Sequence, residues 1–324
     1  MTAIYDCSVD SQLLTGMRLA RGAIGRGELV VIPTDTVYGV AADAFDAAAV
    51  ARLLEAKGRE RTSPPPVLIP GIPTLDALAS EVPGAVRRLV EEFWPGGLTV
   101  ILNAQPSLQW DLGETRGTVA LRMPANPIAL ELLSETGPLA VSSANLSGQP
   151  SATTTADAEV MLGDSVTVYL DGGPAGEGYE AIGERPGDTS STIVDATGLA
   201  VDGGVMRIVR AGVISRERIA EVVGEDMLAP VGEAATDDPF AEAADVPAVA
   251  DEGVASDDPA VADEGAASDE PAASDDPAVA DEGVPSGEGA ASDDPADLDG
   301  PATSGDHAAS ARDTADDGAD AAAS

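Results

Sequence analysis

The last hundred residues limit what this chain can fold into more than any motif does. Residues 225–324 consist almost entirely of Ala, Asp, Glu, Gly, Pro and Ser, and Phe240 is their only aromatic residue. They carry 29 acidic side chains and one basic one, whereas residues 1–224 carry 28 and 16. A segment of this composition buries too little apolar surface to offset the entropy lost on ordering. We therefore expect one folded domain over residues 1–224 and a disordered acidic tail over residues 225–324.

The tail contains a short repeat that does not predict a repeat fold. The sequence Pro-Ala-Val-Ala-Asp-Glu-Gly occurs at 247–253, 259–265 and 277–283. It has no large side chains that neighbouring copies could stack, so a solenoid is disfavoured. We interpret the tail as a solubilising spacer, with a protein-binding tail as the alternative. The roughly 220 remaining residues are enough for one α/β domain with its own core.

The scarcity of histidine and cysteine excludes several kinds of active site. The only histidine, His307, lies in the tail, and Cys7 is the only cysteine. The folded part therefore cannot contain a Ser-His-Asp triad, a Cys-His pair or a histidine-ligated zinc site. Lys57 follows no Gly-x-x-x-x-Gly-Lys-Ser/Thr loop, which excludes an ordinary P-loop ATPase.

Hydropathy indicates the cellular location of the protein. No uninterrupted apolar run approaches the length needed to cross a bilayer. The first residues lack the basic start and the apolar core of an export signal. We expect a cytoplasmic protein that makes no membrane contact.

Apolar periodicity predicts alternating helices and strands over the first 224 residues. We expect helices near 11–25, 46–56, 83–93, 127–135 and 215–223, and strands near 28–32, 67–69, 98–102, 119–122, 139–141, 166–170, 192–194 and 205–209. The mixture predicts an α/β (α+β mixed) fold, in which helices flank a twisted, mixed-direction sheet. The irregular spacing disfavours a regular barrel or a doubly wound repeat.

A polar turn follows the first apolar strand. The strand Leu29–Ile32 leads into Pro-Thr-Asp-Thr-Val-Tyr-Gly-Val at 33–40, and a predicted helix then returns Lys57 and Arg59. A buried strand, a polar turn and two returning cations can form an anion site. Lys57 is the only lysine of the chain. This arrangement indicates nucleotide chemistry.

Hydroxyl groups, turn glycines and arginines recur at the ends of the other predicted strands. Such groups can hold phosphates and a carboxylate. Each is weak evidence alone, because an arginine at a strand end is usually a solvated surface group and Ser-Asn-Ser turns often cap themselves. The segments are Trp-Pro-Gly-Gly-Leu-Thr at 94–99, Arg-Met-Pro at 122–124, Ser-Ser-Ala-Asn-Leu-Ser-Gly at 142–148, Asp-Thr-Ser-Ser-Thr at 188–192 and Arg-Ala-Gly at 210–212.

These segments, taken in order, closely resemble the threonylcarbamoyl-AMP synthase family of YrdC-like proteins. The resemblance rests on the motifs at 33–39, 57–59, 95–99, 122–124, 142–148, 191–195 and 210–212. It covers roughly residues 10–215, nearly the whole expected domain. It implies a YrdC-like fold.

The resemblance also implies a reaction. Family members condense L-threonine, bicarbonate and ATP into threonylcarbamoyl-AMP and release pyrophosphate, with Mg²⁺ carried by the ATP. A tRNA threonylcarbamoyltransferase complex then transfers the group to N6 of adenosine 37 in tRNAs that read ANN codons. The implied protein is a nucleotidyltransferase of tRNA modification, with at most weak contact to RNA itself.

Roles for individual residues follow from the matching motif positions. Lys57 and Arg59 are implied as catalytic cations. Thr36, Arg122 and Ser191 are implied on the threonine side, where the Arg122 guanidinium offers two parallel donors to a carboxylate. The residues implied to bind ATP are Lys57, Arg61, Ser143, Asn145 and Arg210, with Ser142 as a neighbour.

The chain departs from the family pattern in three places. A run of prolines at 64–66 leaves the alignment of that loop open. Asn126 and Pro127 stand where many relatives carry a histidine. The glycine-rich stretch 171–188 reads as an insertion that could cover the site. Two alternatives remain open, an RNA-binding module and a regulatory YrdC-like unit without synthase activity.

Overall fold

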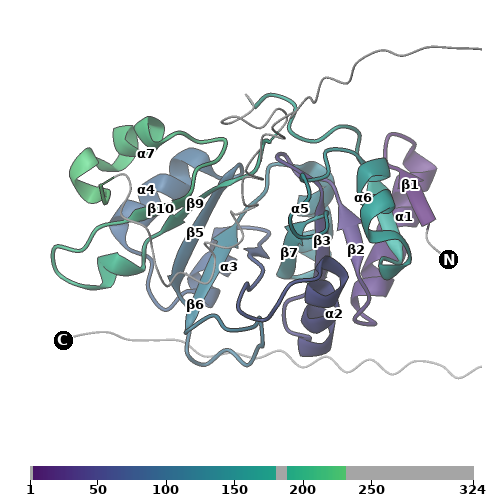
Figure 1. Cartoon of the computed structure of the whole chain (residues 1–324), viewed down its shortest axis with the longest axis horizontal. Coiled ribbons are helices and arrows are strands. Elements are labelled where there is room, and N and C mark those ends of the chain that lie inside the picture. The colour runs from purple at the N-terminus through teal and green to yellow at the C-terminus, as the bar shows by residue number, and fades with distance from the viewer. Residues whose placement is uncertain (1–2, 180–187, 231–324) are drawn as a thin grey trace, which may run out of the picture. The chain divides into compact units, whose positions relative to one another are not determined.

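The computed structural model describes residues 3–179 and 188–230, in which ten strands form one sheet (Figure 1). The strand order is β1-β8-β2-β3-β7-β4-β6-β5-β9-β10. The strands are β1 Ala3–Asp6, β2 Val30–Ile32, β3 Gly39–Asp43, β4 Val67–Leu68, β5 Leu98–Asn103, β6 Thr118–Arg122, β7 Leu139–Ser143, β8 Val168–Asp171, β9 Thr192–Asp195 and β10 Arg207–Arg210.

The sheet is mixed in direction, which confirms the fold class predicted from the sequence. β8 runs parallel to β1 and β2, β4 runs parallel to β6, and β5 runs parallel to β9. The other neighbouring strands are antiparallel. Because β3 pairs with both β2 and β7, the polar turn at 33–38 lies beside the loop that follows β7.

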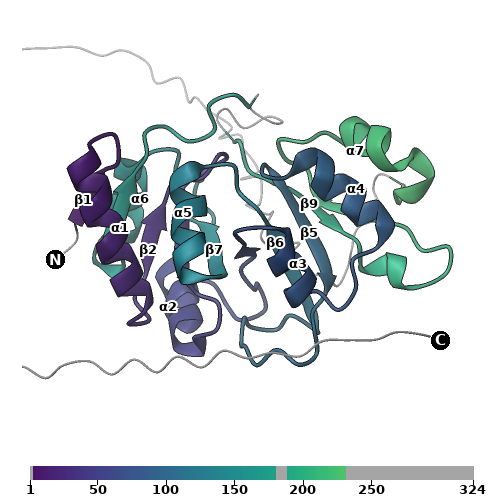
Figure 2. The same cartoon turned by 180° about the vertical axis from the view of Figure 1, so that it is seen from behind.

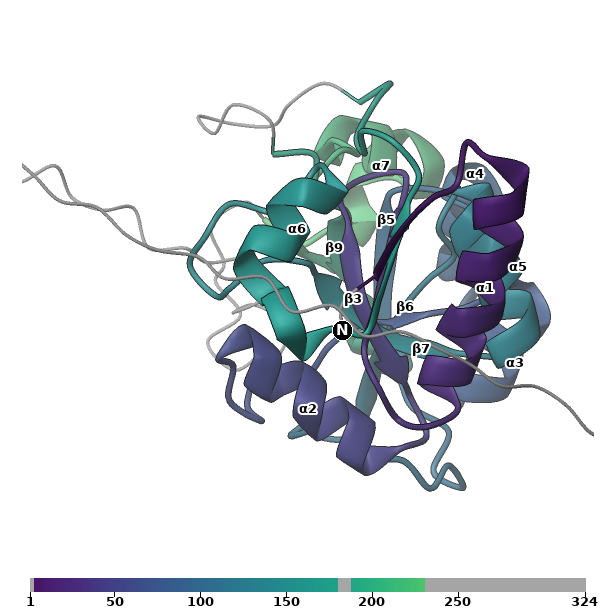
Figure 3. The ribbon, with the colours of Figure 1, turned by 90° about the vertical axis from the view of Figure 1, so that its right-hand side faces the viewer.

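Helices cover both faces of this sheet. Viewed along the sheet, α1, α3, α4 and α5 lie on one side, and α2 and α6 lie on the other (Figures 2 and 3). α7 packs against α4. The helices are α1 Asp10–Ile24, α2 Ala47–Lys57, α3 Ile72–Leu78, α4 Gly84–Phe93, α5 Pro127–Thr136, α6 Thr155–Leu162 and α7 Arg216–Val223. None of the helices in the described ranges is long and apolar enough to span a membrane.

Side-chain caps explain where several helices begin. The Asp46 carboxylate accepts from the backbone amides of Ala48 and Ala49 at the start of α2. Asn126 caps α5 in the same way, and Ser215 caps α7. These polar residues satisfy amides that the first helical turn leaves without an intrahelical partner. α2 ends at Gly58, which has a left-handed backbone (φ 65°).

The apolar run of β2 is buried on both faces. Val30 and Ile32 pack into a cluster with the buried side of α1 and α5. Val31 points the other way and packs with residues of α2 and α6. Successive residues of a strand face opposite sides of the sheet, so a strand between two helical layers reads as continuously apolar.

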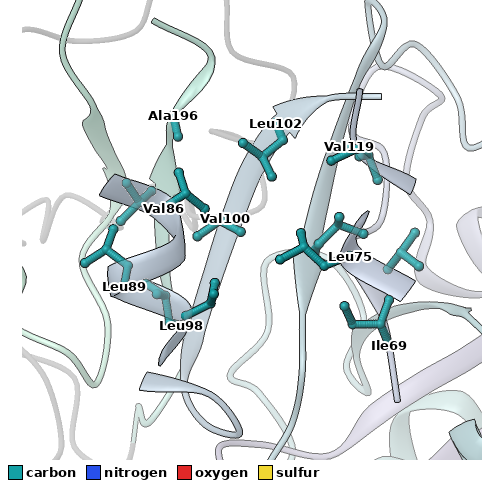
Figure 4. Packing of buried hydrophobic residues seen from close by; sticks show 14 of the residues in the cluster. Ile69, Leu75, Val86, Leu89, Leu98, Val100, Leu102, Val119 and Ala196 are labelled. Atoms are coloured by element: carbon teal, nitrogen blue, oxygen red, sulfur yellow. The ribbon is translucent and has the colours of Figure 1, made fainter. Parts of the chain in front are cut away.

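A larger cluster lies where α3 and α4 meet β5 and β6. Leu75, Leu89 and Val100 are fully buried there, as Figure 4 shows. Burial of a side chain of this size contributes about 1.5–3 kcal/mol. This cluster supports the strands that carry Thr99 and Arg122.

Four elements were not predicted from the sequence: β1, β3, α3 and α6. β3 reads Gly-Val-Ala-Ala-Asp, in which alanine and glycine do not favour a strand, and pairing with β2 and β7 makes it one. α6 is followed at once by a 3₁₀ turn, Gly163–Ser165, and shows little separation of apolar from polar faces. Tertiary contacts override propensity in β3, whereas α6 has helix-forming residues but lacks the amphipathic pattern that would predict it.

Packed structure continues beyond the predicted boundary at residue 224. A 3₁₀ turn, Glu225–Met227, precedes Leu228, which is 6% exposed and belongs to the core. Ala229 donates its backbone amide to Met206 at 2.8 Å. The rest of the disordered tail predicted over residues 225–324, from residue 231 onward, lies outside the described residues.

We expect Leu228→Ala to lower the free energy of unfolding by about 2–4 kcal/mol, because it empties a core position. Urea unfolding followed by circular dichroism measures this change. Leu146→Ala is the control, since Leu146 is 41% exposed, and should have little effect. Equal stability of the two variants would show that residues after 224 do not contribute to the core.

Candidate active site

A polar cleft lies between the β3–β7 and β5–β6–β9 parts of the sheet. It encloses about 560 Å³ of empty space, open solvent included. Loops and strand ends contribute its walls. The lining residues are Thr34, Thr36, Val37, Tyr38, Gly39, Arg59, Pro66, Leu68, Thr99, Arg122, Val141, Ser142, Ser143, Ser190, Ser191 and Arg210.

The turn at 33–38 is held by the hydroxyl of Thr34. This oxygen accepts from the backbone amides of Thr36 and Val37, both at 3.2 Å. It also donates to the carbonyl oxygen of Val37. Such local side-chain hydrogen bonds fix a turn without a longer element. The turn directs Asp35 and Thr36 toward β6.

Arg122, at the end of β6, is a buried cation held by three acceptors. Its guanidinium donates to the Asp35 carboxylate at 2.7 Å, to Thr36 Oγ1 at 2.8 Å and to the Gly96 carbonyl at 2.9 Å. The side chains of Arg122 and Asp35 are only 7% and 10% exposed. A guanidinium has five N–H donors, so donors remain available on the cleft side. The geometry suits recognition of a planar anion.

Arg210 and Ser191 form a second polar group across the cleft. Arg210 donates to Ser191 Oγ at 2.7 Å and to the Ser191 carbonyl at 2.9 Å. Ser191 Oγ also lies 3.0 Å from Thr99 Oγ1. Burial, and then the charge of Arg122, lowers the pKa of Arg210 to about 10. Like charges repel in this space, so an anion bound between them is stabilised.

Gly212 is required by a close approach next to this group. A Cβ atom at residue 212 would stand 2.4 Å from the Ser191 carbonyl carbon and from the Thr192 amide nitrogen. No real side chain tolerates that distance. The Arg-Ala-Gly motif therefore supplies a cation at 210 and a gap at 212 that lets the chain pass behind Ser191.

Lys57 lies behind the cleft wall rather than in the cleft lining. Its ammonium donates to the backbone carbonyl of Ser143, to that of Asn145 at 2.6 Å and to Asn145 Oδ1 at 3.3 Å. The Asn145 amide donates to the carbonyls of Leu146 and Gln149. Lys57 is 1% exposed, and its burial lowers its pKa well below the ordinary value. In this structure Lys57 and Asn145 shape the loop that follows β7.

Arg59 and Arg61 point to different places. Arg59 lines the cleft and donates to Ser142 Oγ at 3.4 Å and to Ser147 Oγ at 3.2 Å. Arg61 instead pairs with Asp111 at 2.6 Å, and both side chains are about half exposed. Arg61 therefore does not line the cleft in this structure, and its predicted role in ATP binding stays a prediction.

The motif residues predicted to act together do converge, with those three exceptions. Thr36, Arg59, Arg122, Ser142, Ser143, Ser191 and Arg210 line one cleft. Lys57 and Asn145 support it from behind, and their direct roles stay predictions. Sequence reasoning missed Tyr179, which lies in the stretch read as an insertion and carries no motif. Its hydroxyl donates to Asp35 Oδ2 at 3.0 Å.

The stretch that we read as an insertion, 171–188, is described in part. Residues 171–179 lie against the 33–38 turn, and Tyr38 donates its hydroxyl to the Gly173 carbonyl at 2.6 Å. Residues 180–187 lie outside the described residues. No group of three or more His, Cys, Asp or Glu side chains suited to a metal gathers within residues 3–179 and 188–230.

Comparison with known proteins gives one consistent result. The family model Sua5_yciO_yrdC, described as telomere recombination, matches residues 22–212. A Mycobacterium tuberculosis protein provisionally named threonylcarbamoyl-AMP synthase is 49% identical over 226 residues, covering 70% of this chain and 97% of that protein. The threonylcarbamoyl-AMP synthase of Pyrococcus abyssi is 37% identical over 66% of this chain and 59% of its own length.

Solved structures agree with the sequence matches. The structure of a P. abyssi Sua5 variant superposes with a TM-score of 0.65 at 31% identity, covering 76% of this chain and 69% of that one. P. abyssi Sua5 complexed with L-threonine superposes with a TM-score of 0.59 at 33% identity, covering 71% and 63%.

We expect Lys57→Met to lower the free energy of unfolding by about 1–3 kcal/mol, because buried carbonyls lose their donor. The folded protein also binds the Lys57 proton more weakly than the unfolded chain does. The free energy of unfolding should therefore increase as the pH rises from the lowered pKa of Lys57 to 10.5. That rise should be absent in Lys57→Met, and urea titrations across this pH range measure it.

Arg52→Met is the matched control for Lys57→Met. Arg52 lies on the same helix and donates to one backbone carbonyl, that of Gly27. Arg52→Met should lower the free energy of unfolding by less than Lys57→Met does. It should leave the pH dependence of the free energy of unfolding unchanged. Wild-type stability and pH dependence in Lys57→Met would show that the ammonium does not support the loop after β7.

Proposed function

The chain belongs to the Sua5/YciO/YrdC family, and on that basis we propose that it is a threonylcarbamoyl-AMP synthase. The proposed reaction condenses L-threonine, bicarbonate and ATP into threonylcarbamoyl-AMP and pyrophosphate. The names of the relatives and the threonine complex of P. abyssi Sua5 support this reaction. A tRNA threonylcarbamoyltransferase complex would consume the product.

One observation carries the proposal: Arg122, fixed by Asp35, faces the same cleft as Arg59 and Arg210. The reaction brings together an amino-acid carboxylate, a carbamate and a triphosphate, all of them anions. Three guanidinium groups with serine and threonine hydroxyls between them suit this set of charges. We assign the threonine carboxylate to Arg122, with Thr36 and Ser191 on the same side.

The other two cations of the cleft, Arg59 and Arg210, are then available for the phosphates of ATP. Arg59 with Ser142 and Ser143 forms one wall, and Arg210 faces it across the cleft. We assign the nucleotide to this part of the site. ATP enters as its magnesium complex, so the metal is part of the substrate.

The chemistry needs no imidazole. The amine of threonine attacks carbon dioxide or bicarbonate to form a carbamate, and water leaves when bicarbonate is the reactant. A carbamate oxygen then attacks the α-phosphorus of ATP, and the bond to the β-phosphate oxygen breaks as pyrophosphate leaves. Transfers of this type depend mainly on positioning and charge neutralisation. Fixed arginines provide both.

We expect the purified chain to release pyrophosphate from ATP with magnesium and bicarbonate when L-threonine is present, and not when the amino acid is left out. L-Serine, which lacks the methyl group, should support less release. Mass spectrometry should detect threonylcarbamoyl-AMP among the products. Threonine-independent release by folded protein would contradict the proposal, and tight RNA binding without turnover would favour the RNA-binding module instead.

We expect Arg122→Lys to raise the KM for L-threonine by about tenfold or more, because an ammonium cannot replace the planar fork that joins Asp35, Thr36 and the substrate. The KM for ATP should change less. Steady-state pyrophosphate assays at saturating co-substrate measure both values.

The control variant is Arg87→Lys, which alters an exposed ion pair with Asp76. Circular dichroism should show both variants folded. A wild-type KM for L-threonine in folded Arg122→Lys would remove Arg122 from the threonine site.

A further inference from the structure

Tyr179 contacts the site from a stretch that carries no recognised motif. It ends the described segment 171–179, is half-buried, and donates its hydroxyl to Asp35 Oδ2 at 3.0 Å. Asp35 is the partner of Arg122. A residue from outside the motifs is thus linked by two hydrogen bonds, through Asp35, to the cation assigned to the threonine carboxylate.

Gly176 allows this segment to approach the site, and the Tyr179 hydroxyl lies at ordinary contact distance from Gly97. Gly176 has φ 82°, and a Cβ there would stand 2.9 Å from the Thr36 carbonyl oxygen. A Cβ at Gly97 would stand 3.5 Å from the Tyr179 hydroxyl and 2.2 Å from Val213. The segment therefore lies directly on the 33–38 turn, with the hydroxyl beside the turn that precedes β5.

Further hydrogen bonds fix the segment in place. The Gly172 amide donates to the Tyr38 hydroxyl at 3.0 Å, and the Ala175 amide donates to the Thr153 carbonyl at 2.8 Å. Both contacts are made on the N-terminal side of Gly176. Tyr179 is consequently presented to Asp35 by a chain held at several points.

The Asp35 carboxylate uses its two oxygens for different partners. Oδ1 accepts from Arg122 at 2.7 Å and from the Ala125 amide at 2.8 Å. Oδ2 accepts from Tyr179. With partners on both oxygens, the plane of the carboxylate is fixed, and so is the direction in which Arg122 presents its remaining donors.

Tyr179 keeps its proton over the working pH range. Burial, and then the negative charge of Asp35, raises the pKa of its hydroxyl to about 12. The hydroxyl is therefore a neutral donor to a charged acceptor. Such a bond is stronger than one between two neutral groups.

We propose that Tyr179 is a positioning residue for the amino-acid substrate, acting on Arg122 through Asp35. This inference rests on the proposed synthase function. Tyr179 does not line the cleft, so its effect should fall on amino-acid affinity rather than on the chemical step or on ATP.

The test compares Tyr179→Phe with Tyr169→Phe in the full chain. Tyr169 is the matched control, since its hydroxyl donates to the Gly163 carbonyl at 2.9 Å away from the cleft and its pKa is also raised to about 12. We expect Tyr179→Phe to raise the KM for L-threonine about tenfold, with kcat and the KM for ATP within about twofold of wild type. Tyr169→Phe should leave all three constants near wild type.

A double-mutant cycle tests whether Tyr179 acts through Asp35. Asp35→Asn should itself raise the KM for L-threonine, and adding Tyr179→Phe should raise it little further. Circular dichroism establishes that each variant is folded. Independent, multiplicative effects of the two substitutions would overturn the proposed route.

Calorimetric titration of wild-type protein with L-threonine separates this inference from the proposed function. No threonine binding by folded wild type, with or without ATP, would overturn both. Threonine binding by wild type with an unchanged affinity in Tyr179→Phe would overturn the role of Tyr179 alone. A tenfold weaker affinity in Tyr179→Phe, with Tyr169→Phe unchanged, is the expected result.

Discussion

The buried ion pair between Asp35 and Arg122 is the contact on which the rest of the site depends. Burying two charges costs several kcal/mol for each ion, so such a pair persists only where further hydrogen bonds satisfy both partners. Thr36 and the Gly96 carbonyl accept from the guanidinium, and the Ala125 amide donates to the carboxylate. These groups come from the turn after β2, the turn before β5 and the segment after β6. One ion pair thus joins three separate parts of the sheet.

The charge of the cleft is opposite to that of the chain. Residues 1–224 contain 28 acidic and 16 basic side chains, yet Arg59, Arg122 and Arg210 share one cleft. Their mutual repulsion contributes to the lowered pKa of Arg210. An anionic ligand relieves that repulsion, whereas the acidic surface affects mainly solubility and long-range encounter. Net charge therefore says little about what this site binds.

Sequence reasoning placed side chains in the cleft where their position is fixed locally, and it did not predict the direction of side chains that depend on distant partners. Arg122 ends β6 and Ser191 directly precedes β9, so strand prediction was enough to bring them to the cleft. Lys57 ends a helix, and its direction depends on how that helix packs against the loop after β7. Arg61 is held outside by a carboxylate fifty positions along the chain. β3, Gly39–Asp43, became a strand through pairing on both sides and not through its composition.

An active site without histidine depends on the rigidity of the protein around it. Where no imidazole moves protons, the protein's contribution is to hold charges where substrate charges will be, and donors that are already oriented need no reorganisation during reaction. Close backbone approaches supply that rigidity here: Gly97 packs on Val213, and Gly212 packs behind Ser191. These approaches leave no room for a Cβ atom, so a larger residue at 97 or 212 would displace the Val213 side chain or the backbone of Ser191 and Thr192. The motif glycines thus help to fix the backbone that carries the cleft's polar side chains.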